Sequence, residues 1–180
     1  MIIEVPEFVK APESLRAFAL YQAFTDFDAP DGECYKRVAI QDIPEVREAL
    51  LEMFPQAEIL GMGFRLNFND ELPNQAVHSD LGWGTHALVL YLSEGPGGTA
   101  FWRHIATDTV GINSGEGELL HRIQTDWDNE DAWELRYLCK GAFGKAVIYP
   151  GHYYHSRYPF KAYGNAPETG RLVAVAFFNL

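Results

Sequence analysis

Residues 75–94 read QAVHSDLGWGTHALVLYLSE, and the second half of this stretch decides the class of fold. Residues 87–92 are apolar throughout, which is typical of a short strand that is buried on both faces of a sheet. Residues 95–98, GPGG, form a turn, and residues 99–103, TAFWR, begin the next strand. This part of the chain is therefore predicted to be a β-structured core.

Further strands are predicted on both sides of this stretch, from runs rich in apolar and aromatic residues. They lie at residues 59–68, 133–139, 145–149 and 172–178. Residues 106–130 are polar and acidic with no steady period, so we expect them to form a long connection, with a lid over a site as one option. The succession of short strands is typical of a β-sandwich or barrel.

Two helices are predicted before the strands. Pro12 fits the first turn of one helix, with apolar residues following on one face. Asp42 is expected to cap the other, with Pro44 in its first turn. We therefore expect an α+β chain that is mainly β, with both helices packed outside the sheet. Residues 1–180 are expected to form one domain, with helical support in residues 1–56 and the β core in residues 57–180.

Composition narrows the classes of partner. The chain has 14 Lys and Arg against 25 Asp and Glu, a formal net charge of −11, which disfavours broad nucleic-acid binding. The two cysteines do not form a close pair, as expected of free thiols in a reducing compartment. No apolar run reaches the ~20 residues of a membrane span, and the first residues lack a signal-peptide pattern. We expect a cytoplasmic protein.

Three places carry residues suited to metal chemistry. His78 and Asp80 are two apart, so in an extended segment their side chains point the same way and can meet on one ion. His152 and His155 follow the predicted strand at 145–149, and Arg171 opens the last strand. Two histidines and one carboxylate are the ligands of non-haem iron(II) oxygenases, although zinc takes the same ligand types.

These segments together resemble the iron(II)- and 2-oxoglutarate-dependent dioxygenases, especially small prolyl-hydroxylase-like members of bacterial or phage type. The resemblance is carried by four segments, QAVHSDLGWGTHALVLYLSE, GGTAFWRH, KAVIYPGHYYHSRYP and GRLVAVAFFN. It implies a double-stranded β-helix (jelly roll), with iron held by His78, Asp80 and a distal histidine. His155, followed by serine and a nearby proline, fits the family pattern for that histidine better than His152, which then belongs to the structure or the pocket rim.

The resemblance also implies how the co-substrate binds. Arg171 would pair with the far carboxylate of 2-oxoglutarate, because a guanidinium fork matches a carboxylate. Tyr91 would help to hold the same carboxylate; an ordinary core tyrosine is the alternative. Where relatives carry an early tyrosine this chain has Phe68, so Asn67 is a candidate for that hydrogen bond. Trp83 either lines the substrate entrance or covers the edge of the core.

The implied activity is hydroxylation of a protein side chain or a small molecule, with release of succinate and CO2. The alternative is a non-catalytic jelly-roll binding module that retains a metal site, and a metal-dependent hydrolase is a weaker third. His86, His104 and His121 are expected to be structural or solvated. The sequence leaves the substrate and the oligomeric state open.

Overall fold

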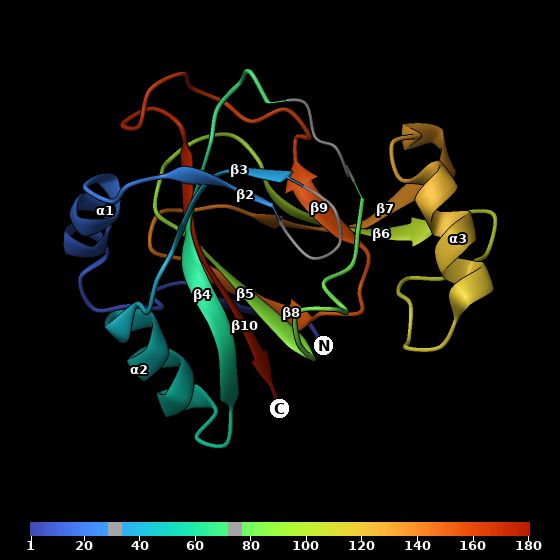
Figure 1. The fold of residues 1–180 in the computed structure, drawn as a ribbon, viewed down its shortest axis with the longest axis horizontal. Coiled ribbons are helices and arrows are strands. Elements are labelled where there is room, and N and C mark those ends of the chain that lie inside the picture. Colours follow the sequence, from blue (N-terminus) through green and yellow to red (C-terminus); the bar gives the residue numbers. More distant parts are fainter. Residues whose placement is uncertain (29–33, 72–76) are drawn as a thin grey trace.

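The computed structural model describes residues 1–28, 34–71 and 77–180, which form two antiparallel sheets packed face to face (Figure 1). The larger sheet has the order β1-β8-β5-β10-β4-β3-β2. Its strands are β1 (Ile3–Val5), β2 (Thr25–Asp28), β3 (Cys34–Ile40), β4 (Glu58–Asn67), β5 (His86–Tyr91), β8 (Ala146–Pro150) and β10 (Arg171–Asn179). The smaller sheet has the order β7-β6-β9, with β6 (Gly98–His104), β7 (Trp133–Lys140) and β9 (His155–Tyr158). This arrangement is a double-stranded β-helix, as predicted.

Strand β10 separates two apolar layers. Its residues at even positions, from Leu172 to Phe178, pack in a cluster with Leu15 and Leu50 of the helices. Its residues at odd positions face the smaller sheet, where Val173 packs with Phe101 of β6. Because side chains alternate along a strand, burial on both faces requires the unbroken apolar run from which this strand was predicted.

The two predicted helices are α1 (Pro12–Leu20) and α2 (Pro44–Met53), and both pack against the outer face of the larger sheet (Figure 1). Each begins with its proline, as expected. The predicted cap at Asp42 is wrong, because Ile43 occupies the cap position and no side chain caps the helix. Asp42 instead accepts hydrogen bonds of 2.8 and 2.6 Å from Arg47.

The N-terminal third contributes more than helices. Strands β1, β2 and β3 also come from it, with β1 pairing with β8 and β3 pairing with β4. Residues 106–130 also differ from the predicted connection, because they contain helix α3 (Gly117–Asp126), which is followed by the short turn η1 (Glu130–Ala132). Ile123 of α3 is buried against Trp133 and Tyr154, away from the two main layers. No helix in the described part of the chain is long and apolar enough to cross a membrane.

Candidate metal centre and its cavity

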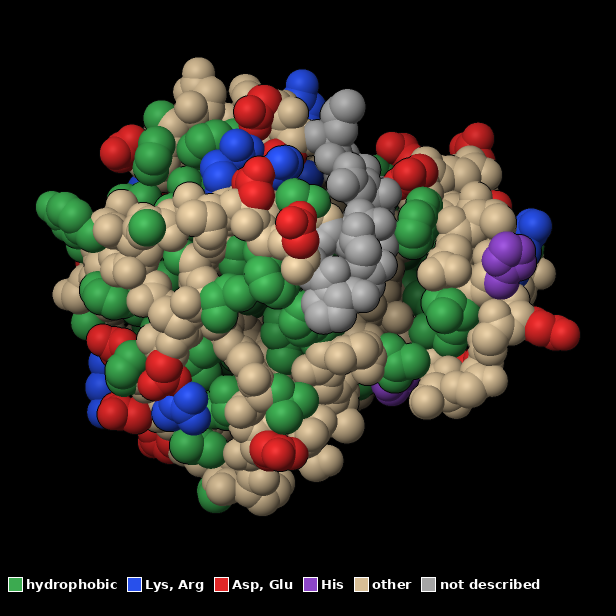
Figure 2. Space-filling view, in the orientation of Figure 1, with side chains coloured by type: hydrophobic (Ala, Val, Ile, Leu, Met, Phe, Trp, Pro, Cys, Tyr) green, Lys and Arg blue, Asp and Glu red, His purple; other side chains and the backbone are tan. Residues whose placement is uncertain are grey.

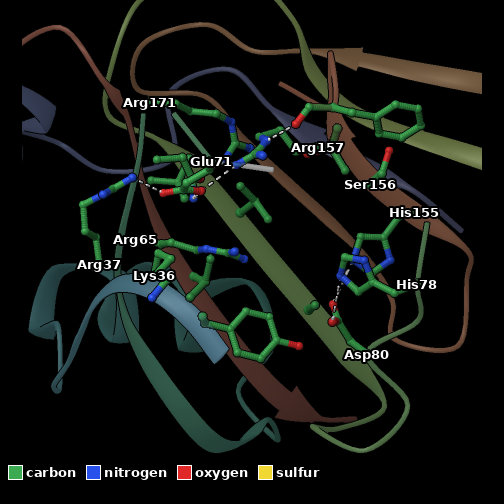
Figure 3. A pocket seen from close by; sticks show the side chains of 18 of the residues that line it. Lys36, Arg37, Arg65, Glu71, His78, Asp80, His155, Ser156, Arg157 and Arg171 are labelled. Carbon is green, nitrogen blue, oxygen red and sulfur yellow. Dashed lines mark hydrogen bonds and ion pairs between the residues drawn. The ribbon is translucent and has the colours of Figure 1, made fainter. Parts of the chain in front are cut away.

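The structure brings His78, Asp80 and His155 together at one end of a cavity between the two sheets (Figure 3). One nitrogen or oxygen atom from each lies within 4.8 Å of the others. The Nε2 atoms of His78 and His155 are 3.8 and 3.2 Å from the two carboxylate oxygens of Asp80. The ring centroids of the two histidines are 4.5 Å apart.

The backbone fixes this cluster. His78 and His155 face each other across an antiparallel bridge, with N–H to carbonyl distances of 3.0 and 2.8 Å. This bridge continues the smaller sheet beyond β9 and places both imidazoles beside each other. The N–H of Asp80 donates to the carbonyl of Gly151 at 2.7 Å, so the segment carrying the carboxylate is tied to the turn after β8. Backbone hydrogen bonds therefore fix the positions of all three residues.

Neighbouring groups orient two of the three side chains. The Nδ1 of His155 lies 3.0 Å from the carbonyl oxygen of Tyr153. Because a carbonyl only accepts, Nδ1 carries the proton and Nε2 points at Asp80. The hydroxyl of Tyr149 donates to Asp80 Oδ2 at 3.1 Å. Such outer contacts are the usual support of metal-binding imidazoles and carboxylates.

The electrostatics keep Asp80 in its charged form. Burial alone would raise the pKa of this carboxyl, but attraction to His155 and His78 outweighs burial, so the pKa is lowered. Burial would lower the pKa of His155, but Asp80 outweighs it and the pKa is raised. Two imidazole nitrogens and one carboxylate oxygen, converging from one side, fit a first-row divalent metal with open positions.

Only one of the two candidate distal histidines joins the cluster. His155 opens β9 and points inward, whereas His152 packs edge-on against the ring of Tyr153 at 4.8 Å. His86 stacks on Phe178, as expected of a structural histidine. His104 is fully buried, with ring nitrogens 2.8 Å from Thr107 and 3.0 Å from Asp126. His121 is exposed.

The cavity has a volume of about 320 Å³ and reaches from the metal cluster to Arg171 (Figure 3). The Arg171 side chain is buried, and its Nη1 donates to Asn67 Oδ1 at 3.2 Å. Asn67 therefore lies beside Arg171. It is the residue predicted from the sequence as a candidate for one hydrogen bond to the co-substrate. Phe68 does not share that place, because its ring stacks under the guanidinium of Arg37 at 4.2 Å.

Tyr91 lies behind the cavity wall. Its hydroxyl is 2.7 Å from Thr99 Oγ1, and it is Thr99 that lines the cavity. Its ring centre is 5.9 Å from the guanidinium carbon of Arg171. A contact between Tyr91 and a bound carboxylate stays a prediction. Trp83 stacks on Phe177 at 5.4 Å and supports the cavity wall through that residue.

Many cavity residues had no predicted role, among them Tyr149, Arg37, Arg65, Glu71 and Arg157. A signal existed for two of them. Arg65 is two residues before Asn67, and Arg157 is two after His155, so each shares a strand face with a predicted site residue. Glu71 gave no such signal, because it belongs to a turn after β4. Its carboxylate lies 2.7 Å from Arg37 and 3.2 Å from Arg157.

Solved structures with the same fold include proteins named for α-ketoglutarate or for iron. The non-haem α-ketoglutarate-dependent epimerase SnoN from nogalamycin biosynthesis matches with a TM-score of 0.57 at 14% identity, over 98% of this chain and 77% of its own. A 2OG-Fe(II) oxygenase family oxidoreductase from Burkholderia pseudomallei gives 0.53 at 13%, over 98% and 84%. EctD from S. alaskensis with bound Fe gives 0.55 at 13%, over 99% and 72%.

No family model matches the chain, and no curated protein matches it. The structural likeness is therefore a likeness of fold, at identities too low to carry more. The chain has the double-stranded β-helix fold of 2-oxoglutarate- and iron-dependent oxygenases. This confirms, at the level of the fold, the resemblance found in the sequence.

Proposed function

We propose that this protein is an Fe(II)- and 2-oxoglutarate-dependent dioxygenase that hydroxylates a C–H bond and releases succinate and CO2. The observation that carries the proposal is the pairing of two features in one cavity. A cluster of two histidines and a carboxylate lies at one end, and the buried guanidinium of Arg171 lies at the other. A metal chelator with a second carboxylate at its far end matches both features.

Each residue has a stated task in this proposal. His78, Asp80 and His155 hold iron through Nε2, a carboxylate oxygen and Nε2, and Tyr149 keeps the carboxylate in place by its hydrogen bond. Arg171 pairs with the far carboxylate of 2-oxoglutarate. Bound iron supplies redox chemistry with dioxygen, coupled to decarboxylation of the co-substrate.

One part of the cavity wall is apolar and would exclude water from the metal cluster. Val89 of β5 and Val173, Val175 and Phe177 of β10 form this part, beside the charged side chains of the same cavity. A volume of about 320 Å³ lies at the lower end of ligand pockets, which run from roughly 300 to 1,000 Å³. We therefore propose that the substrate is a small molecule or one side chain of a protein.

Two of the structural neighbours favour the small-molecule option. SnoN was solved with Fe³⁺, α-ketoglutarate and nogalamycin RO, and EctD with 2-oxoglutarate and 5-hydroxyectoine. SnoN is itself named an epimerase and SnoK a carbocyclase, so assay of the product decides whether this protein hydroxylates its substrate. The cytoplasmic location and the exclusion of a nucleic-acid partner stay predictions.

Oxygen-dependent turnover of the co-substrate tests the proposal. Purified protein with Fe(II), ascorbate and 2-oxoglutarate should form succinate under air, alone or on addition of candidate small molecules. His155→Ala should abolish this turnover. The matched control is His152→Ala, three residues away and outside the cluster, which should leave turnover unchanged. A protein that binds iron and forms no succinate under any of these conditions would favour the non-catalytic binding module.

A further inference from the structure

The cavity is lined by an unusual share of the basic residues of this acidic chain. Five of its 14 Lys and Arg line the cavity, namely Lys36, Arg37, Arg65, Arg157 and Arg171, whereas the whole chain has a net charge of −11. Figure 2 shows basic side chains, interleaved with acidic ones, gathered over the part of the molecule where β2 and β3 lie. The cavity and the surface of the chain thus differ in the sign of their charge.

Three of the five cations are neutralised within the protein. Arg37 lies 2.7 Å from Glu71 and 2.9 Å from Asp70, and Arg157 lies 3.2 Å from Glu71. Lys36 is half exposed and lies 2.6 Å from Asp26. These side chains need no ligand to balance their charge.

The other two of the five cavity cations, Arg65 and Arg171, form no ion pair within residues 1–28, 34–71 and 77–180. Arg171 is assigned above to the far carboxylate of 2-oxoglutarate. Arg65 is therefore the cavity cation that has no acid partner among the described residues and no task in the proposed function.

Arg65 is placed to meet a ligand. It stands on β4 opposite Val173 of β10, on the inner face of the larger sheet. In Figure 3 its guanidinium points into the cavity, between Glu71 and the metal cluster. Its Nε is buried and has no hydrogen-bond partner in the part of the chain that the structure describes, and its guanidinium carbon lies 5.0 Å from the ring centre of Tyr35.

The Nε–H of Arg65 is buried without a hydrogen bond to any described residue, which is costly, and a charge-assisted hydrogen bond to a carboxylate is the usual compensation. Burial, and then repulsion from Arg157, lowers the pKa of Arg65, and the weaker attraction to Glu71, Tyr35 and Asp80 does not offset this lowering. A ligand that carries an acid group would remove this penalty on binding.

We propose that Arg65 is a second anion-binding residue of the cavity, and that it holds a carboxylate other than the one that Arg171 takes. The inference rests on the proposed function, since it assumes that Arg171 holds one end of 2-oxoglutarate. Two sources share this chemistry. One is the keto-acid end of 2-oxoglutarate, which would reach Arg65 beside the metal, and the other is an acid group on the primary substrate.

Two titrations on Arg65→Met separate these sources. The first adds 2-oxoglutarate to the Fe(II) protein without oxygen and follows the visible absorption. The second adds sodium acetate to protein already saturated with Fe(II) and 2-oxoglutarate, with sodium chloride at equal ionic strength as the reference, and follows thermal unfolding. Lys36→Met is the matched control, because it removes another cavity cation that has its own acid partner.

Loss of one charge-assisted bond should weaken binding by about tenfold or more. Weaker binding of 2-oxoglutarate to Arg65→Met supports the inference and identifies the co-substrate as the source. Unchanged binding of 2-oxoglutarate, together with loss of an acetate-specific stabilisation that the unaltered protein shows, supports it and identifies the primary substrate. Lys36→Met should change either quantity by less than about threefold.

The inference is overturned if neither titration distinguishes Arg65→Met from the unaltered protein. If Arg65→Met does not fold, Arg65→Lys replaces it. This variant keeps the charge and loses the fork, so binding should weaken several-fold, and unchanged binding overturns the inference. Failure of the proposed function appears separately, as the absence of any 2-oxoglutarate-dependent absorption in the unaltered protein.

Discussion

Glutamine at position 71 is expected to destabilise the folded protein by about 2–3 kcal/mol, whereas asparagine at position 70 should change its stability by less than about 0.5 kcal/mol. Both carboxylates accept a hydrogen bond from Nη2 of Arg37, Glu71 at 2.7 Å and Asp70 at 2.9 Å. Their exposure differs, since the Glu71 side chain is 8% exposed and that of Asp70 67%. Burial is therefore the main variable between the two substitutions.

The expected loss of stability in Glu71→Gln follows from the partners of Glu71. Its carboxylate also accepts from Arg157 at 3.2 Å and from Asn67 at 2.8 Å, so it joins β3, β4 and β9 across the two sheets. Removing one member of a buried ion pair costs about 3–5 kcal/mol. Glutamine keeps an acceptor oxygen, and the Arg37 side chain is 25% exposed, so water screens its charge. For these two reasons the expected cost is about 2–3 kcal/mol, at or below the bottom of that range.

Urea denaturation of the unaltered protein, Glu71→Gln and Asp70→Asn measures both free energies of unfolding. For a chain of this size, 2–3 kcal/mol corresponds to a fall in Tm of about 5–10 °C. If the free energy of unfolding falls with urea concentration at the same slope in all three proteins, they expose the same surface on unfolding. A difference below about 1 kcal/mol between the two variants would refute the reasoning that burial makes Glu71 the central charge of this network.

Two further predictions concern the metal cluster and Glu4, which lies on β1 at the edge of the larger sheet. Tyr149→Phe removes the 3.1 Å hydrogen bond to Asp80, and should weaken Co(II) binding about tenfold in a competition titration; unchanged affinity would show that the hydroxyl does not support the site. Burial alone would raise the pKa of Glu4, but hydrogen bonds from Lys145 and Tyr137 outweigh it and lower that pKa. Their stabilisation is therefore present above the pKa of the unfolded carboxyl and lost as pH falls through the folded value. Glu4→Gln should cost about 1 kcal/mol near neutral pH and progressively less as the pH falls below the ordinary pKa of a carboxyl, and a cost that does not fall with pH would contradict this linkage.

The parts of the fold predicted from sequence are those in which local pattern and burial agree. The apolar runs of β5, β8 and β10 are buried on both faces, so each was visible as an unbroken stretch. Strands β1 and β2 have three and four residues and lie at the sheet edges, where pairing with a neighbour rather than their own pattern makes them strands. Helix α3 was missed because one buried residue, Ile123, stands among polar ones.

The site divides in a similar way. His78 and Asp80 were predictable because side chains two apart in an extended segment point the same way, and His155 because it is followed by serine and a nearby proline, the pattern of the resembled family. The roles of Arg65 and Glu71 depend on which acid meets which cation across three strands and a turn. That pairing is a property of the folded chain, since β3, β4 and β9 are far apart in sequence.

Visible absorption of the protein with Fe(II) and 2-oxoglutarate, without oxygen, tests the central claim most directly. Chelation of iron by the keto acid within the cluster should give a weak absorption band that saturates with 2-oxoglutarate. Asp80→Ala should abolish the band, and Arg171→Met should shift its titration to higher concentration while iron stays bound. A protein that binds iron through His78, Asp80 and His155 and shows no band at any concentration of 2-oxoglutarate would contradict the proposed function.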